Sequence, residues 1–312
     1  MSKKHTQNII AESRKTLPIT IIYGVGIWLL AGLVNNGWWF QFLCFFASVY
    51  AMIHLNNMNL MIRIYSRSVS AAYIMLSCIT VWLFPSVNGA VIQLGSVLIL
   101  LLLFSCYQDQ QTKGRTFYIF LIASVISLLE PLYLLFVPII WLLMATTVYS
   151  MCFRSFFASL IGLVTPYWLY AGWLLYNNIQ NPEMALSFTS RFTEIQWATD
   201  YNALTRPQII YLALLVVVFL VGTLHFWFTS YMDKIRVRQT YTSLIMITLY
   251  TLILLAVQPQ IYDVLIYMLT IAVSPIIAHF VSLTHTRMSN IFFLLLMIVI
   301  FTLTGMNLWI SL

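Results

Sequence analysis

The chain is dominated by long apolar segments that are separated by short polar connections. A transmembrane α-helix needs about 20 mostly apolar residues, because each residue advances the helix by about 1.5 Å and the hydrocarbon core is about 30 Å thick. Segments that approach this length cover residues 17–34, 38–55, 69–85, 90–107, 116–130, 132–152, 155–176, 209–231, 241–257, 261–282 and 291–310. This pattern predicts an all-α, polytopic transmembrane bundle of about eleven spans, with residues 1–312 forming a single transmembrane domain.

The composition identifies lipid as the solvent for most of the surface. Hydrophobic residues make up 62% of the chain and charged residues 7%, whereas soluble domains have about 45–50% apolar and about 25% charged residues. So few charged side chains cannot cover a globule of this size. Membrane lipids are therefore the first expected partners.

The basic residues predict the orientation of the spans, because lysine and arginine are enriched in cytoplasmic loops. With eleven spans and a cytoplasmic N-terminus, the cytoplasmic segments hold 13 of the 15 basic residues: Lys3, Lys4, Arg14, Lys15, Arg63, Arg67, Lys113, Arg115, Arg154, Lys234, Arg236, Arg238 and Arg287. We therefore predict a multi-pass protein of the cell inner membrane whose C-terminus is external. The net charge of +7 is not gathered on a soluble module, which argues against nucleic acid as a partner.

The one long connection, residues 177–208, is predicted to be external. Asn181-Pro182-Glu183 is a typical helix start, with a capping asparagine, a proline at the first helical position and an acid in the first turn. Apolar residues follow at helical spacing: Met184, Phe188, Phe192 and Ile195. We expect an amphipathic helix at the outer membrane surface. It either caps the bundle or roofs a cavity between the spans.

Glu130 is the acid that solvation explains least well. It lies in Leu128-Leu129-Glu130-Pro131-Leu132, 15 positions after Arg115, which places it about 22 Å up a core of about 30 Å. An ionised carboxylate at such a depth costs about 2.5–3.5 kcal/mol, so a functional role is the default hypothesis. A helix-end acid at a turn is the alternative.

Four further residues are predicted to line a cavity with Glu130. Tyr133 follows it by one turn, and Asp263 lies near the outer end of its span. Arg191 and Arg206 are the basic residues of the external loop. The alternative for Asp263 is a first-turn carboxylate that interacts with the positive end of the helix dipole.

The other ionisable groups are explained without a site. Three acids fall in predicted cytoplasmic connections, where water solvates them: Glu12, Asp109 and Asp233. Three histidines share no spacing and are interpreted as structural: His54, His225 and His279. No motif of a metalloprotease, a serine hydrolase or a phosphate-binding loop is present. We therefore assign no cofactor, no metal ligand and no catalytic residue, and Glu130 stays the only candidate.

A stretch in the middle of the chain resembles a known family. From Ser66 to about Trp173, an apolar span ends in Pro85 and a second span ends in a charged patch. A hairpin through Glu130-Pro131 follows, and then a span that contains Thr165-Pro166-Tyr167-Trp168. This order is similar to the middle of polyprenyl-phosphate-sugar-dependent glycosyltransferases with the type C fold. The whole chain also looks like an uncharacterised family of polytopic inner-membrane proteins from Bacteroidota.

The resemblance implies work on lipid-linked sugars, but the first external loop departs from the family. Type C transferases carry a catalytic acid in a long first external loop, whereas this loop is Asn35-Asn36-Gly37. We therefore expect a non-catalytic or partner-dependent component of envelope or glycoconjugate biogenesis. Its partner would be a polyprenyl-linked lipid or another membrane protein. The alternatives are a glycosyltransferase with an atypical active site, and a proton-coupled or small-solute transporter that uses Glu130 and Asp263.

Overall fold

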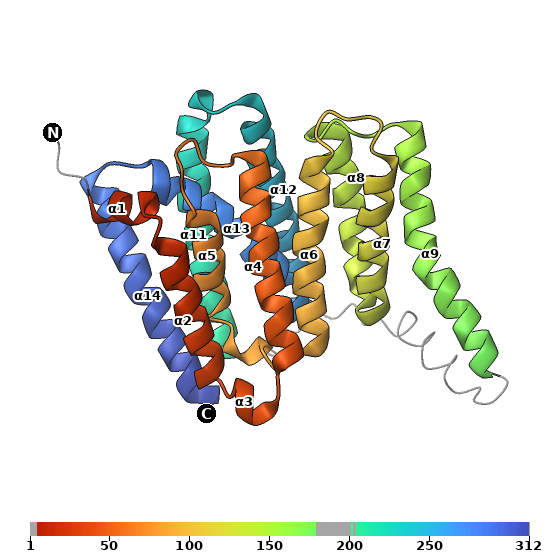
Figure 1. Ribbon diagram of the computed structural model, residues 1–312, viewed down its shortest axis with the longest axis horizontal. Helices are drawn as coiled ribbons and strands as arrows, with labels where there is room; N and C mark the ends of the chain where they lie inside the picture. The colour runs from red at the N-terminus through yellow and green to blue at the C-terminus, as the bar shows by residue number, and fades with distance from the viewer. Residues whose placement is uncertain (1–4, 179–200, 202–203, 312) are drawn as a thin grey trace.

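The computed structural model describes residues 5–178, 201 and 204–311, and every regular element in these ranges is helical (Figure 1). The α-helices are α1 (Thr6–Glu12), α2 (Thr16–Leu30), α3 (Leu33–Asn36), α4 (Trp39–Asn59), α5 (Ser68–Ser77), α6 (Val87–Ser105), α7 (Lys113–Leu129), α8 (Phe136–Thr146), α9 (Phe153–Asn178), α11 (Arg206–Thr229), α12 (Ile235–Val257), α13 (Tyr262–Leu283) and α14 (Arg287–Ser311). Four short 3₁₀ helices join them: η1 (Val81–Leu83), η2 (Pro131–Leu135), η4 (Ser230–Met232) and η5 (Pro259–Ile261).

The prediction of an all-α chain with several membrane helices is confirmed. In the described ranges, seven helices are long and apolar enough to cross a membrane, namely α4, α6, α9, α11, α12, α13 and α14 together with their short 3₁₀ extensions. The helices α2, α5 and α8 are apolar but shorter. The predicted amphipathic helix of 177–208 lies almost entirely outside the described residues.

Three of the predicted apolar segments are not continuous helices. The segment 69–85 leaves the helix after Ser77 and passes through η1, where the Thr80 hydroxyl donates to the Ser77 carbonyl group. The segment 132–152 begins as η2 and ends its helix at Thr146. The segment 17–34 is interrupted at Gly32, whose φ of +95° is strained for residues with a Cβ. In all three segments the helix is interrupted by a local turn, and a hydropathy profile contains no information about such turns.

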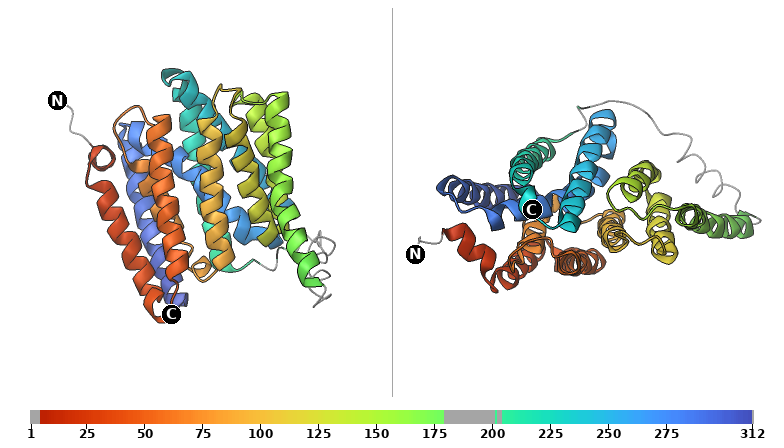
Figure 2. Two further views of the ribbon diagram at one scale, coloured as in Figure 1. Left: turned by 45° about the vertical axis from the view of Figure 1, so that its right-hand side comes forward. Right: turned by 90° about the horizontal axis from the view of Figure 1, so that it is seen from above.

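The centre of the bundle is α13, in which only Asp263 and Leu283 are not buried. Helices α5, α6, α11 and α12 pack against it. Seen from above, α1, α2 and α14 lie on one side of the bundle and α7, α8 and α9 on the other (Figure 2). The packing of α11 on α13 is close, because a Cβ at Gly222 would lie 2.7 Å from Ile276 Cγ2. Small residues commonly allow such an approach between membrane helices.

The connections alternate between the two ends of the bundle (Figure 1). The connections α4–α5, α6–α7, α8–α9, α11–α12 and α13–α14 lie at the end where α1 lies, which we call the α1 end. The C-terminal end of α14 lies at the opposite end. Nine described basic residues lie in these connections or in the adjoining turns of their helices: Arg63, Arg67, Lys113, Arg115, Arg154, Lys234, Arg236, Arg238 and Arg287.

Candidate functional site: an apolar groove beside a buried ionic cluster

The residues predicted to line an outer cavity are distributed over several elements. Glu130 is half-buried at the break between α7 and η2. Tyr133 is buried, and its hydroxyl lies 2.9 Å from Ser96 Oγ on α6. Arg206 is exposed at the start of α11, and the exposed Asp263 accepts a hydrogen bond of 3.2 Å from Gln208 Nε2. Arg191 lies outside the described residues.

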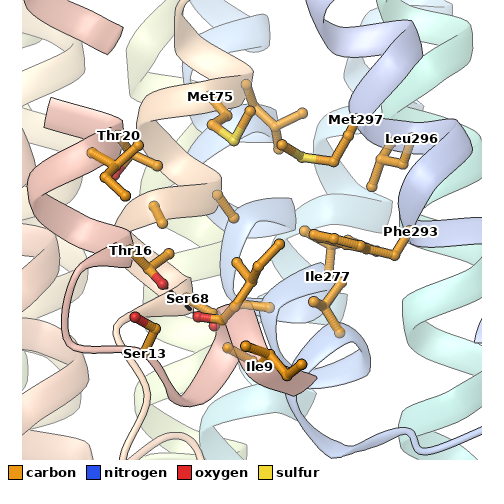
Figure 3. Close-up of a pocket in the computed structure, with 18 of the residues that line it drawn as sticks. Ile9, Ser13, Thr16, Thr20, Ser68, Met75, Ile277, Phe293, Leu296 and Met297 are labelled. Atoms are coloured by element: carbon orange, nitrogen blue, oxygen red, sulfur yellow. Dashed lines mark hydrogen bonds between the residues drawn. The ribbon is translucent and has the colours of Figure 1, made fainter. Parts of the chain in front are cut away.

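A groove of about 320 Å³ lies elsewhere, between α1, α2, α5, α13 and α14 (Figure 3). Its lining does not include Glu130, Tyr133, Arg206 or Asp263, the four described residues that were predicted to line a cavity. Its volume is at the lower end of the range for small-molecule sites, about 300–1,000 Å³. Four of its lining residues are alanines, and their small side chains leave the space between the helices: Ala11, Ala71, Ala72 and Ala278. Larger side chains at these positions would fill it.

The two ends of the groove differ in polarity (Figure 3). Ser13, Thr16 and Ser68 place hydroxyl groups near the α1 end. Met75 and Met297, deeper along α5 and α14, line the other end together with Leu296. This distribution of polar and apolar side chains therefore suits a molecule with a long apolar part and a polar end.

Helix α1 roofs the groove and is held at both ends by buried polar contacts. Asn8 Nδ2 donates to the carbonyl oxygen of Thr284, at 2.9 Å, and Gln7 Nε2 donates to the same oxygen. The Ser66 hydroxyl donates to the carbonyl oxygen of Ala11, at 2.8 Å. These contacts turn the polar face of α1 inward.

The opposite face of α1 is apolar and exposed. Ile9 is 55% exposed and Ile10 is 40% exposed, and both line the rim of the groove. The exposed isoleucines give α1 an apolar outer face, which is the kind of surface that lipid covers at a membrane interface. We did not predict this element, because seven residues with a polar face give no hydropathy signal.

A buried ionic cluster lies near the α1 end of α13; we call Arg63, Asp233 and His279 the Asp233 cluster. The side chains of Asp233 and His279 are fully buried. Arg63 Nε donates to Asp233 Oδ1 at 2.6 Å, and His279 Nε2 lies 3.1 Å from Asp233 Oδ2. Because an ionised carboxylate only accepts hydrogen bonds, Nε2 carries the proton. Our assignment of Asp233 to a solvated connection was therefore wrong.

The Asp233 cluster joins elements that are far apart in the sequence. Arg63 follows α4, Asp233 precedes α12, and His279 lies on α13. Arg63 Nη2 also donates to the carbonyl oxygen of Thr229 at the C-terminal end of α11, at 3.4 Å. The negative end of the helix dipole stabilises a cation at this position. The ring of His225 on α11 lies 5.7 Å from that of His279, so the two histidines are neighbours although their positions in the sequence show no relation.

The electrostatics of the cluster favour an ionised carboxylate. Burial alone would raise the pKa of Asp233, but the hydrogen bond from His279 and the guanidinium of Arg63 outweigh it and hold the pKa below its ordinary value. His279 Nδ1 is buried and has no hydrogen-bond partner among the described residues. In those residues no three His, Cys, Asp or Glu side chains lie close enough together to hold a metal ion.

The groove and the Asp233 cluster are interpreted from their own geometry, because comparison with known proteins gives no relative. No family model, no curated protein and no solved structure matches this chain.

Proposed function

We propose that the chain is an eleven-span protein of the cell inner membrane, with its N-terminus and the α1 end in the cytoplasm. The support is the alternation of the connections, which brings nine described basic residues to one end of the bundle (Figure 1). Positive charge gathers on the cytoplasmic side of inner-membrane proteins. On this proposal the Asp233 cluster lies near the cytoplasmic interface.

We further propose that the protein binds the hydrocarbon chain of a membrane lipid and works as a non-catalytic component of envelope or glycoconjugate biogenesis. The observation that carries this is the groove. It lies mostly among apolar helices, and its lining is almost entirely apolar. Water entering it would find few polar partners, whereas the acyl chain of a lipid would fill it through van der Waals contacts and leave no polar group unsatisfied.

Photo-crosslinking tests this proposal with the full chain in lipid nanodiscs. The probe is a phospholipid with a diazirine in the middle of one acyl chain, and mass spectrometry locates the labelled residues. We expect labelling to concentrate on Met75 and Met297. Ala72→Phe should abolish it, because this half-buried alanine lines the groove.

The matched control is Ala158→Phe, at a half-buried alanine of α9 outside the groove. It should leave the labelling of Met75 and Met297 unchanged, and neither variant should alter labelling of the exposed Trp168 on α9. Labelling spread evenly over the lipid-facing residues, with no response to Ala72→Phe, would exclude chain binding in the groove.

Proton-linked transport is a second candidate, favoured by His279 next to Asp233, because its Nδ1 has no hydrogen-bond partner in the described part of the chain. Ionisable residues buried among membrane helices commonly belong to proton relays. On this alternative, proteoliposomes with a trapped pH dye should take up protons, and His279→Gln should stop the uptake. A proton flux equal in wild type and His279→Gln would exclude this role for the cluster.

A further inference from the structure

The basic residues at the polar end of the groove indicate which lipid it holds. Arg14 and Lys15 are exposed and lie between Ser13 and Thr16, which both line the groove. Arg67 directly precedes a third lining residue, Ser68. Among the described residues that adjoin the lining residues of the polar end, Glu12 is the one acid. The positive charge therefore exceeds the negative charge where a lipid headgroup would lie.

The charged group of Arg67 is held at the surface of the bundle by Tyr65. Arg67 Nε donates to the Tyr65 hydroxyl at 3.0 Å, and its guanidinium lies 5.9 Å from the centre of the Tyr65 ring. The Ser13 hydroxyl oxygen accepts a hydrogen bond of 3.1 Å from the Lys15 N–H, and Ser13 directly precedes Arg14. A phosphate at this level could accept hydrogen bonds from the Ser13 hydroxyl and from a guanidinium group together, which are the usual partners of phosphate oxygens in proteins.

The groove reaches the surface of the bundle at α1 and α2. Ile19, which lines it on α2, is 62% exposed, and Ile9 on its rim is 55% exposed. A lipid could thus place one chain between α2 and α14 while a second chain stays in the surrounding bilayer. This favours a lipid with two chains over one with a single long chain.

We propose that the groove selects an anionic two-chain phospholipid of the cytoplasmic leaflet, with one acyl chain against Met75 and Met297 and its phosphate at Arg14 and Lys15. This inference rests on the proposed lipid-binding function. It goes beyond that function because it specifies the headgroup charge and the residues that recognise it. Near a membrane surface each lysine or arginine strengthens the binding of anionic lipid by about fivefold.

The test compares three diazirine probes of equal amount in nanodiscs of phosphatidylcholine: phosphatidylglycerol, phosphatidylcholine and undecaprenyl phosphate. We expect phosphatidylglycerol to label Met75 and Met297 most strongly. The double variant Arg14→Gln with Lys15→Gln should lower its advantage over phosphatidylcholine by about five- to thirtyfold. The matched control, Lys113→Gln with Arg115→Gln, changes two basic residues at the same end but at the start of α7, and should leave the advantage unchanged.

The outcomes separate the two proposals. Equal labelling of the groove by phosphatidylglycerol and phosphatidylcholine would overturn the headgroup inference and leave chain binding intact. Preferred labelling by undecaprenyl phosphate would overturn the two-chain assignment. An equal loss of the phosphatidylglycerol advantage in the control variant would show that general surface charge, and not Arg14 and Lys15, sets the preference. Absence of groove labelling by any probe would instead refute the proposed function itself.

Discussion

Removal of the Asp233 carboxylate should destabilise the protein strongly, although the sequence places Asp233 between two spans. In Asp233→Ala, His279 keeps a fully buried Nε2–H with no acceptor, which costs about 1–3 kcal/mol. The Arg63 side chain is 31% exposed, so water can replace much of its lost contact and its part is about 1 kcal/mol. The free energy of unfolding should therefore fall by about 2–4 kcal/mol. Asp233→Asn keeps one acceptor and should lose about half as much.

The assay is reversible unfolding in mixed micelles, followed by tryptophan fluorescence as the share of denaturing detergent rises. The matched control is Asp109→Asn, which removes another acid at the α1 end. The Asp109 side chain is 46% exposed and lies 4.0 Å from Arg115, so its loss should change the free energy of unfolding by less than about 0.5 kcal/mol. If Asp233→Ala changes the free energy no more than Asp109→Asn does, the buried cluster does not stabilise the fold.

Three further predictions concern pH, packing and topology. Because the pKa of Asp233 is held below its ordinary value, its stabilisation is present above about pH 4 and is lost as the pH falls through the folded-state pKa. Wild type should therefore lose more unfolding free energy below about pH 4 than Asp233→Asn; parallel curves would contradict this. Gly222→Ala places a Cβ 2.7 Å from Ile276 Cγ2 and should cost about 1–3 kcal/mol, whereas Gly26→Ala meets no atom within 4 Å and should be neutral or stabilising by up to about 1 kcal/mol. An equal effect of the two would refute the close packing of α11 on α13. A fluorescent reporter that folds only in the cytoplasm should be dark at the C-terminus and bright when inserted in the connection that contains Lys234, and the reverse pair of results would overturn the proposed orientation.

The helical class of this fold is predictable because hydropathy acts over whole segments. Each of the eleven apolar segments overlaps an α-helix of the structure over most of its length. The boundaries are less predictable, since local hydrogen bonds decide them. The end of α5 at Ser77 depends on contacts around Thr80, and a hydropathy window sees only apolar residues there.

The candidate site is harder to predict because it is assembled from distant residues. Arg63, Asp233 and His279 come from three different parts of the chain, and each alone is typical of a solvated turn or an ordinary buried histidine. Glu130 attracted attention because its neighbours in the sequence are apolar, yet it is half-buried at a helix break. The more deeply buried acid is Asp233, whose neighbours include Lys234. Tertiary packing, and not local hydropathy, determines which carboxylate is buried.

The groove and the Asp233 cluster meet on the same helix. Ala278, which lines the groove, is followed directly by His279, so the two residues point to different faces of α13. The hydrogen bond from His279 to Asp233 fixes α13 against the end of α11 and the start of α12. A rotation or a shift of α13 along its axis would break that bond and would also move Ala278 and Ile277 relative to α14. The bond that holds His279 against Asp233 therefore also helps to hold one wall of the groove in place.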